Sequence, residues 1–244
     1  MEQETPSGEL SASDQDQIRA ALCSTRGRYQ AERASQLSGV PRTTVYYWAR
    51  EGLLVPDHYH LHPKSWSYRD LVLLRMFAWL RLKGMAPPRA GQRAVEVRQR
   101  LDRGELPGNG SVRSDGSIFL IGDAAVDELT GIQLFDVLVP LVDRFDMLMP
   151  VVDGSVPRSP ERRQRWHGPH LLWPSRRTAI SPWVLSGEPC VRETRIPSAS
   201  LFALTEERRL GSADIVELYP ALRLEDVDDA IALERGLRAH RLAA

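Results

Sequence analysis

The sequence contains little cysteine and no long uninterrupted hydrophobic segment. Cys23 and Cys190 lie far apart without CxxC or metal-ligand spacing, which excludes a disulfide framework and a cysteine-based zinc site. The longest apolar run, from Leu71 to Leu82, is interrupted by two arginines, and the acidic N-terminus lacks the basic and apolar regions of a signal peptide. We therefore expect a cytoplasmic chain with no membrane partner, built from roughly one to three small globular domains.

Sequence motifs of the common enzyme classes are also missing. There is no GxGxxG after a strand, no Walker A, no GxSxG and no HExxH. The acidic residues Asp226, Asp228 and Asp229 fit the first turn of a helix, where carboxylates are favoured. His58, His60 and His62 alternate and would share one face of a strand, but no second cluster of ligands accompanies them. We expect no catalysis, no cofactor and no metal site.

The net charge of zero, from 32 basic and 32 acidic residues, conceals a strong segregation of charge. By segment the net charge is −4 over residues 1–25, +9 over 26–100, −7 over 101–157, +5 over 158–177 and −3 over 178–244. A basic module attached to acidic ones is typical of a protein that binds a polyanion with one part of its chain. Nucleic acid is therefore the leading candidate partner.

The pattern of elements predicts a mainly α fold with small β elements. We divide it into a mobile N-terminal arm (1–25), a winged helix-turn-helix (26–104), a connector of a β-hairpin and a helix (105–152), a basic linker arm rich in Arg, Pro and Trp (153–177), and a small C-terminal three-helix domain with short strands (178–244). The linker assignment rests on a lack of any period over 153–174.

Two short helices around a glycine turn mark the basic domain. Ala31, Ala34 and Leu37 recur at helical spacing, Gly39 supplies a stop, and Pro41 suits the first turn of a second helix that reaches about residue 51. A polar excursion over 57–66 is expected to form a small two-stranded wing, and helices are expected over 67–83 and 88–103. In such a domain the second helix enters the major groove of DNA.

The remaining elements are predicted from turn and cap residues. Asp115-Gly116 indicates a hairpin over 111–121, and an apolar helix is expected over 133–144. Short strands are expected at 178–180 and 195–196, followed by helices over 198–209, 212–218 and 224–239, with Ser212 capping the second.

Side chains of the second helix and the wing carry the predicted contacts to DNA. Guanidinium groups suit guanine edges and phosphates, and hydroxyls suit phosphate oxygens. The candidate DNA-binding residues are Arg33, Arg42, Thr43, Thr44, Tyr46, Tyr47, Arg50, His58, His60, Lys64 and Ser65.

The stretch from Ala34 to Gly84 resembles the MerR family of winged helix-turn-helix proteins. The matching residues are those from Val40 to Trp48, then Gly52-Leu53-Leu54, Trp66-Ser67 and Asp70-Leu71. Tyr46 stands where that family usually has arginine, and no long dimerising helix or cysteine cluster follows. The resemblance therefore implies a DNA-reading domain without the metal or drug sensing of that family.

The C-terminal part resembles a small helical, antitoxin-like family that occurs beside PIN-domain toxins. The matching stretches are Gly187 to Val191, Thr194 to Pro197, Gly211-Ser212, Ile215, Tyr219-Pro220 and Leu224 to Val227. The middle segments Asp115-Gly116 to Thr130-Gly131 and Phe135 to Val137 are similar to the connector of longer members. Glu193 replaces the glycine usual in that family, so we expect a different turn there.

Taken together, the chain resembles a VapB-type antitoxin with a MerR-like head. This implies a cognate PIN-domain ribonuclease toxin, neutralised by direct binding, and an operon repressed through operator DNA. Arginine pairs well with the carboxylates of such an active site, and Trp can anchor in an apolar groove. The candidate toxin-binding residues are Arg158, Arg162, Arg163, Arg165, Trp166, Trp173, Arg176 and Arg177.

A homodimer is expected because one helix-turn-helix buries too little surface for tight and specific binding. The helices over 71–82 and 133–144 are the candidate dimer interfaces. The alternative is a MerR-like transcriptional regulator whose C-terminal domain senses a small ligand and which has no toxin partner.

Overall fold

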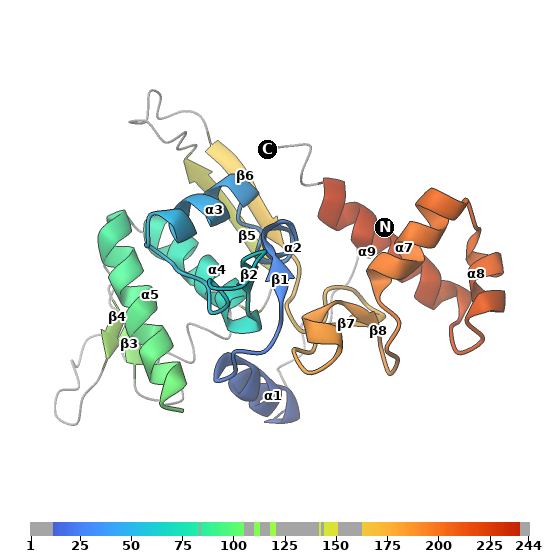
Figure 1. Ribbon diagram of the computed structural model, residues 1–244, viewed down its shortest axis with the longest axis horizontal. Coiled ribbons are helices and arrows are strands. Elements are labelled where there is room, and N and C mark those ends of the chain that lie inside the picture. The colour runs from blue at the N-terminus through green and yellow to red at the C-terminus, as the bar shows by residue number, and fades with distance from the viewer. Residues whose placement is uncertain are drawn as a thin grey trace.

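The computed structural model describes residues 12–82, 84–104, 110–112, 118–120, 142, 144–150 and 163–239. Helices dominate these ranges and the strands form short antiparallel pairs, which confirms the expected mainly α fold with small β elements (Figure 1). No helix in these ranges is long and apolar enough to cross a membrane. The helix predicted over 133–144 lies outside the described residues except for Val142 and Arg144.

The N-terminal unit, residues 12–102, is named the head. Its described residues form five helices and one strand pair. Strand β1 pairs with β2 antiparallel, which connects the segment before α2 to the end of the wing. The helices predicted over 41–51, 67–83 and 88–103 are confirmed to within one residue at each end. The elements of the head are α1 Ala12–Leu22, β1 Tyr29–Gln30, α2 Ala31–Ser38, α3 Arg42–Arg50, β2 Ser65–Trp66, α4 Tyr68–Leu82 and α5 Pro87–Asp102.

The prediction of a mobile N-terminal arm is wrong for α1. Ile18, Ala21 and Leu22 are fully buried and belong to the same hydrophobic core as α2, α3 and α4. Residues spaced by three and four along a helix share one face, and burying that face against α4 stabilises the short helix. Local composition concealed this because the rest of α1 is polar.

Helix α4 is the central element of the head. Every side chain from Leu71 to Ala78 is buried, including that of Arg75. The guanidinium of Arg75 donates to the carbonyls of Leu37 and Ser38 at the end of α2, at 2.6 and 3.1 Å, and to that of Pro169 at 2.6 Å. These acceptors offset the cost of burying a cation. Because Leu71 to Ala78 are covered within one chain, this part of the predicted dimer interface is not available to a second copy.

In the chain, two strand pairs follow α5 and precede the C-terminal unit. Strands β3, Gly110–Val112, and β4, Ile118–Leu120, pair antiparallel and confirm the predicted hairpin. Strands β5, Phe145–Pro150, and β6, Arg163–Gly168, also pair antiparallel. The prediction of an irregular linker arm is therefore wrong over residues 163–168, whereas residues 169–177 contain no helix or strand. Trp166 of β6 is buried and packs against Trp48 of α3, with ring centroids 6.1 Å apart.

The C-terminal unit surrounds a second, smaller core. Its elements are β7 Thr178–Ala179, the short helix η1 Leu185–Gly187, β8 Cys190–Val191, α7 Ser198–Arg208, α8 Ser212–Leu218 and α9 Leu224–Ala239. The three predicted helices are confirmed. Val191, Leu201, Phe202, Ile215, Leu222, Val227, Ala230 and Ile231 form the core.

Three local predictions for this unit are wrong. Strand β7 pairs with β8, and the segment Arg195-Ile196 is no strand: it only offers the Ile196 carbonyl to the Val191 N–H at 3.0 Å. Gly211, not Ser212, precedes α8, and its N–H donates to the carboxylate of Asp214 at 2.8 Å. At Glu193, which replaces a glycine, a different turn was predicted. Glu193 instead adopts the left-handed conformation with φ of 59°, a backbone that suits glycine.

Candidate nucleic-acid interface

The turn between α2 and α3 sets the direction of the exposed helix. Gly39 has φ of 78°, and its N–H donates to the Ser35 carbonyl at 2.9 Å, which ends α2. Pro41 precedes the first residue of α3 in an extended conformation, as proline allows at a helix start. Val45, Trp48 and Ala49 then bury one face of α3 in the core of the head. The opposite face is left to solvent.

That solvent face carries most of the predicted DNA contacts. Arg42, Thr43 and Arg50 are exposed, and Tyr46 and Tyr47 are 45% and 43% exposed. Each arginine lies 5.6 Å from the centroid of a tyrosine ring, Arg42 over Tyr46 and Arg50 over Tyr47. Stacking of this kind holds a guanidinium in place while its N–H groups donate to an acceptor, here Glu32 for Arg42 and Glu51 for Arg50. Thr44 is half-buried at the edge of the same face.

The wing is smaller than predicted. A single bridge between His58 and Ser65 replaces the expected two-stranded excursion. The His58 ring nitrogen Nε2 lies 3.1 Å from the Gly27 carbonyl, and the Lys64 ammonium lies 3.8 Å from the centroid of the Tyr59 ring. His60 is exposed. Lys64 and His60 thus remain candidates for phosphate contact.

Ser65 does not belong to this surface. Its side chain is buried in β2, and its hydroxyl donates to the Pro63 carbonyl at 3.2 Å. The prediction that Ser65 contacts DNA is therefore wrong, because strand pairing with β1 turns the residue inward.

A buried ion pair anchors the base of the wing to α4. The Asp57 carboxylate accepts two hydrogen bonds from the Arg69 guanidinium, at 2.7 and 2.8 Å, and one from the Ser67 hydroxyl at 2.5 Å. Burial acts to raise the pKa of Asp57, but the hydrogen bonds from Arg69 and Ser67 and the charges of Arg98 and Arg69 outweigh it, so this pKa lies below its ordinary value. The first residue of the wing is thus fixed to the core.

Asp70 continues this cluster toward α5. Its carboxylate accepts the backbone N–H groups of Ser67 and Asp57 at 2.8 and 2.9 Å, and the Arg98 guanidinium at 2.5 Å. The Asp70 N–H in turn donates to the Ser67 hydroxyl at 3.2 Å, which completes a capping box at the start of α4. Burial raises the pKa of Asp70 to about 6.

Arg33 has a different role from the one predicted. On α2, its guanidinium forms a two-pronged pair with the Glu234 carboxylate of α9, at 2.7 and 3.0 Å, and reaches Glu188 at 3.1 Å. The Glu234 side chain is fully buried and also accepts the Ser198 hydroxyl at 2.6 Å. The prediction that Arg33 contacts DNA is therefore wrong, because Arg33 joins the head to the C-terminal unit.

The residues predicted to bind a toxin are dispersed by the fold. Trp166 is buried, Trp173 stacks on His170 with ring centroids 5.1 Å apart, and Arg177 pairs with Asp226 of α9 at 2.8 Å. The prediction of a free arm is wrong for these three, because both tryptophans pack on the core of the head and Arg177 pairs with α9. Of the others, Arg165 pairs with Asp146 of β5 and Arg176 is exposed. Arg163 begins β6, and Arg158 and Arg162 lie outside the described residues.

The sequence carries no sign of the carboxylates that pair with Arg165 and Arg33. Asp146 and Glu234 carry no local motif, because their partners lie 19 and 201 residues away in the chain. One signal was present for β6: in its sequence, Arg163, Arg165 and His167 alternate with Gln164, Trp166 and Gly168. That period of two is typical of a strand with one face turned to the core.

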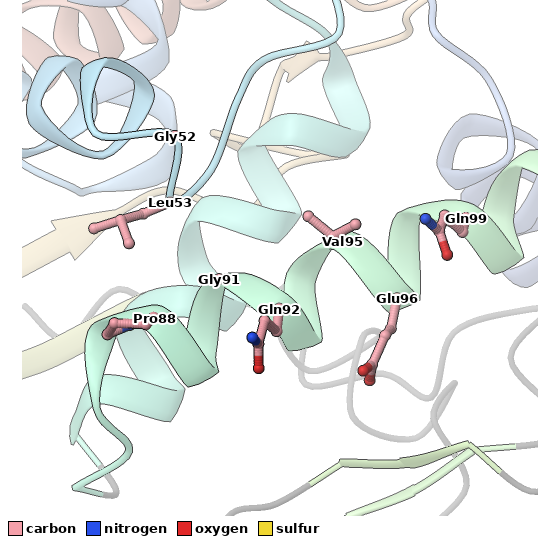
Figure 2. A pocket seen from close by; sticks show the side chains of 8 residues that line it. All are labelled: Gly52, Leu53, Pro88, Gly91, Gln92, Val95, Glu96 and Gln99. Carbon is pink, nitrogen blue, oxygen red and sulfur yellow. The ribbon is translucent and has the colours of Figure 1, made fainter.

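A hollow of about 420 Å³ lies between the end of α3 and helix α5 (Figure 2). Gly52, Leu53 and Gly91 line it, and Gln92, Glu96 and Gln99 lie along α5 beside it (Figure 2). Among the residues that the structure describes, no three metal-ligating side chains come together here or elsewhere. This hollow has no convergent charged or nucleophilic groups, so α3 and the wing remain the candidate site.

Comparison with known families locates one match in the C-terminal unit. No curated protein and no solved structure matched the chain. Residues 179–233, which run from β7 into α9, match the family described as "Protein of unknown function (DUF433)".

Proposed function

We propose that this chain is a DNA-binding antitoxin: it binds operator DNA as a homodimer through the head, and it neutralises a PIN-domain ribonuclease by direct contact. In this proposal the chain performs no catalysis and represses its own operon. Toxin binding would join dimers on the operator and tighten repression.

The observation that carries the DNA-binding part is the solvent face of α3. Arg42 and Arg50 there pair with Glu32 at 3.1 Å and with Glu51 at 2.9 Å, and both pairs are well exposed. Exposed ion pairs contribute little free energy, so phosphate displaces the carboxylates at small cost. Tyr47, beside them, adds a hydroxyl and an apolar ring that suit the edge of a base pair.

The toxin-binding part rests on other support. Residues 187–227 resemble antitoxin-like proteins, and the family match covers the same unit. Leu218 and Leu224, which flank the turn between α8 and α9, are 59% and 49% exposed. Apolar side chains this exposed suit a protein contact, so the proposal places the toxin on this turn.

The test of DNA binding uses the full chain and a labelled duplex from upstream of its own coding sequence. Fluorescence anisotropy is expected to show tight binding that Arg42→Ala with Arg50→Ala weakens by at least tenfold. Arg208→Ala with Arg209→Ala, an equal loss of charge at the C-terminal end of α7, is the control and should leave the affinity unchanged. Equal affinities for the two double variants contradict the proposed interface.

The test of toxin binding is co-expression with the adjacent reading frame, followed by size-exclusion chromatography and a ribonuclease assay. A stable complex with silenced ribonuclease is expected, and Leu218→Glu with Leu224→Glu should break it while DNA affinity is kept. Without a complex or a ribonuclease, the antitoxin proposal fails and a transcriptional regulator remains.

A further inference from the structure

The β5–β6 pair is held against the end of α2 and the turn that leads into α3. Adding a Cβ at Gly39 would bring it within 2.6 Å of the Gly168 nitrogen, so β6 ends directly against the turn before α3. Two residues earlier, Trp166 packs on Trp48 near the end of α3. Arg75 fixes the same junction by donating to Leu37 and Pro169. Figure 1 shows the two strands beside α2 and α3.

Strand alternation gives this pair one core face and one solvent face. Trp166 and its cross-strand partner Met147 face the core, and both pack against it. Arg165 and Asp146 belong to the opposite face, on which side chains of adjacent strands meet. The Arg165 side chain is 70% exposed and that of Asp146 is 39% exposed. An arginine is thus presented to solvent from a strand anchored to α3.

The turn on which β6 packs leads directly into α3. The major groove is about 12 Å wide, so an element packed on the turn before a helix that enters the groove lies near the phosphates at its edge. The Arg165 Nε donates to Asp146 at 2.8 Å, and the terminal nitrogen of Arg165 also contacts this carboxylate. Both partners are exposed, so solvent and salt screen the pair and a phosphate can compete with Asp146 for the guanidinium.

We propose that Arg165 contacts the DNA phosphate backbone beside the groove that α3 enters, and that Asp146 is the counter-charge that phosphate displaces. This inference rests on the proposed DNA binding. It reassigns to DNA a residue that the sequence suggested for a toxin. It also gives the head a second basic contact on the side of α3 formed by β6.

The test measures affinity of the full chain for the upstream duplex and for a scrambled duplex at several salt concentrations. Arg165→Ala is expected to weaken binding to both duplexes roughly fivefold and to lower the salt slope by about one, since one phosphate contact is lost. Asp146→Asn is expected to tighten binding roughly twofold, because it removes a negative charge next to a phosphate.

An equivalent ion pair in the C-terminal unit supplies the matched controls. Arg235 of α9 and Glu206 of α7 are exposed and lie 3.5 Å apart, so Arg235→Ala and Glu206→Gln repeat the same changes away from the head. Neither control should alter DNA affinity. Thermal unfolding should be the same for all four variants, since every side chain changed is exposed.

Four outcomes overturn the inference. If Arg165→Ala binds DNA with the affinity and salt slope of the wild-type chain, Arg165 makes no phosphate contact, and the proposed function is unaffected. If Asp146→Asn weakens DNA binding as much as Arg165→Ala does, the ion pair only holds the strands together. Loss of a toxin complex in Arg165→Ala with unchanged DNA affinity assigns the residue to a protein partner. A wild-type chain that binds neither duplex overturns both the inference and the DNA-binding function.

Discussion

Arg33 of α2 and Glu234 of α9 form a two-pronged ion pair across the junction between the head and the C-terminal unit. Burial opposes the charge on Arg33, but hydrogen bonding and the charge of Glu234 outweigh it and raise the pKa of Arg33. Close to it, the buried Tyr29 hydroxyl donates to the Gly187 carbonyl at 2.9 Å. The first helix of the helix-turn-helix is therefore joined to the unit that carries the proposed toxin surface.

Removing the buried carboxylate should destabilise the whole chain. Glu234→Gln leaves the Arg33 cation, whose side chain is 11% exposed, without its main partner. We expect a loss of about 3 kcal/mol in the free energy of unfolding, measured by urea denaturation. Glu188→Gln removes the outer partner of Arg33, which is 34% exposed, and should cost below about 1 kcal/mol. Equal losses in the two variants would show that burial of the pair has no effect.

The stability of the head should depend on pH through Asp70. Its pKa in the folded chain is about 6, above the ordinary 3.8, so the folded state takes up a proton first as the pH falls. The contribution of Asp70 to stability therefore increases from pH 7 toward pH 4, by on the order of 1 kcal/mol per pH unit below pH 6. Asp57 has a lowered pKa and the opposite effect. Its carboxylate stabilises the folded chain at neutral pH, and this contribution is lost only below about pH 4.

Asp70→Asn should abolish this slope because it cannot take up the proton. Urea denaturation at pH 7, 6 and 5 measures the effect, with Asp102→Asn as a control on an exposed partner of Arg69. The same slope in wild type and Asp70→Asn would mean that Asp70 titrates normally in the folded chain.

Glu193→Gly should stabilise the C-terminal unit. Glu193 is exposed and has φ of 59°, a conformation that costs a residue with a Cβ about 1–2 kcal/mol. Glycine removes that cost but gives the unfolded chain more freedom, which leaves a net gain of about 0.5–1 kcal/mol. Glu193→Ala keeps the Cβ and should show no gain. Thermal unfolding compares the two variants, and a higher midpoint for alanine would contradict the assigned conformation.

Gly168→Ala should displace β6 from the end of α2 and from Arg75 of α4. A Cβ at Gly168 would lie 2.6 Å from the Arg75 guanidinium and 2.8 Å from the Leu37 carbonyl. We expect a loss of about 2 kcal/mol, since backbone and a buried cation must shift. Gly236→Ala in α9 meets nothing within 4 Å and should instead add about 1 kcal/mol through helix propensity. If Gly168→Ala unfolds at the wild-type urea midpoint, β6 packs loosely on the head.

Much of the helical structure follows from local sequence. The capping box of Ser67 and Asp70 starts α4, Pro41 starts α3, and Gly39 ends α2. Helices form through hydrogen bonds between residues four apart, so the residues that start and stop them lie within the same short stretch. For this reason α3, α4, α5 and the three C-terminal helices could be located from the sequence, together with the exposed face of α3.

The sequence by itself thus determined the mainly α fold, the helix ends and the candidate DNA-reading face. Tertiary structure alone decided the β5–β6 pair, the burial of α1 and Trp166, and the place of Arg33 beside a carboxylate 201 residues away. An arginine has the same local pattern whether it meets a phosphate or a buried carboxylate. The physical reason is that strand pairing, burial and ion pairing join residues remote in the chain, and which of them meet depends on how the helices pack.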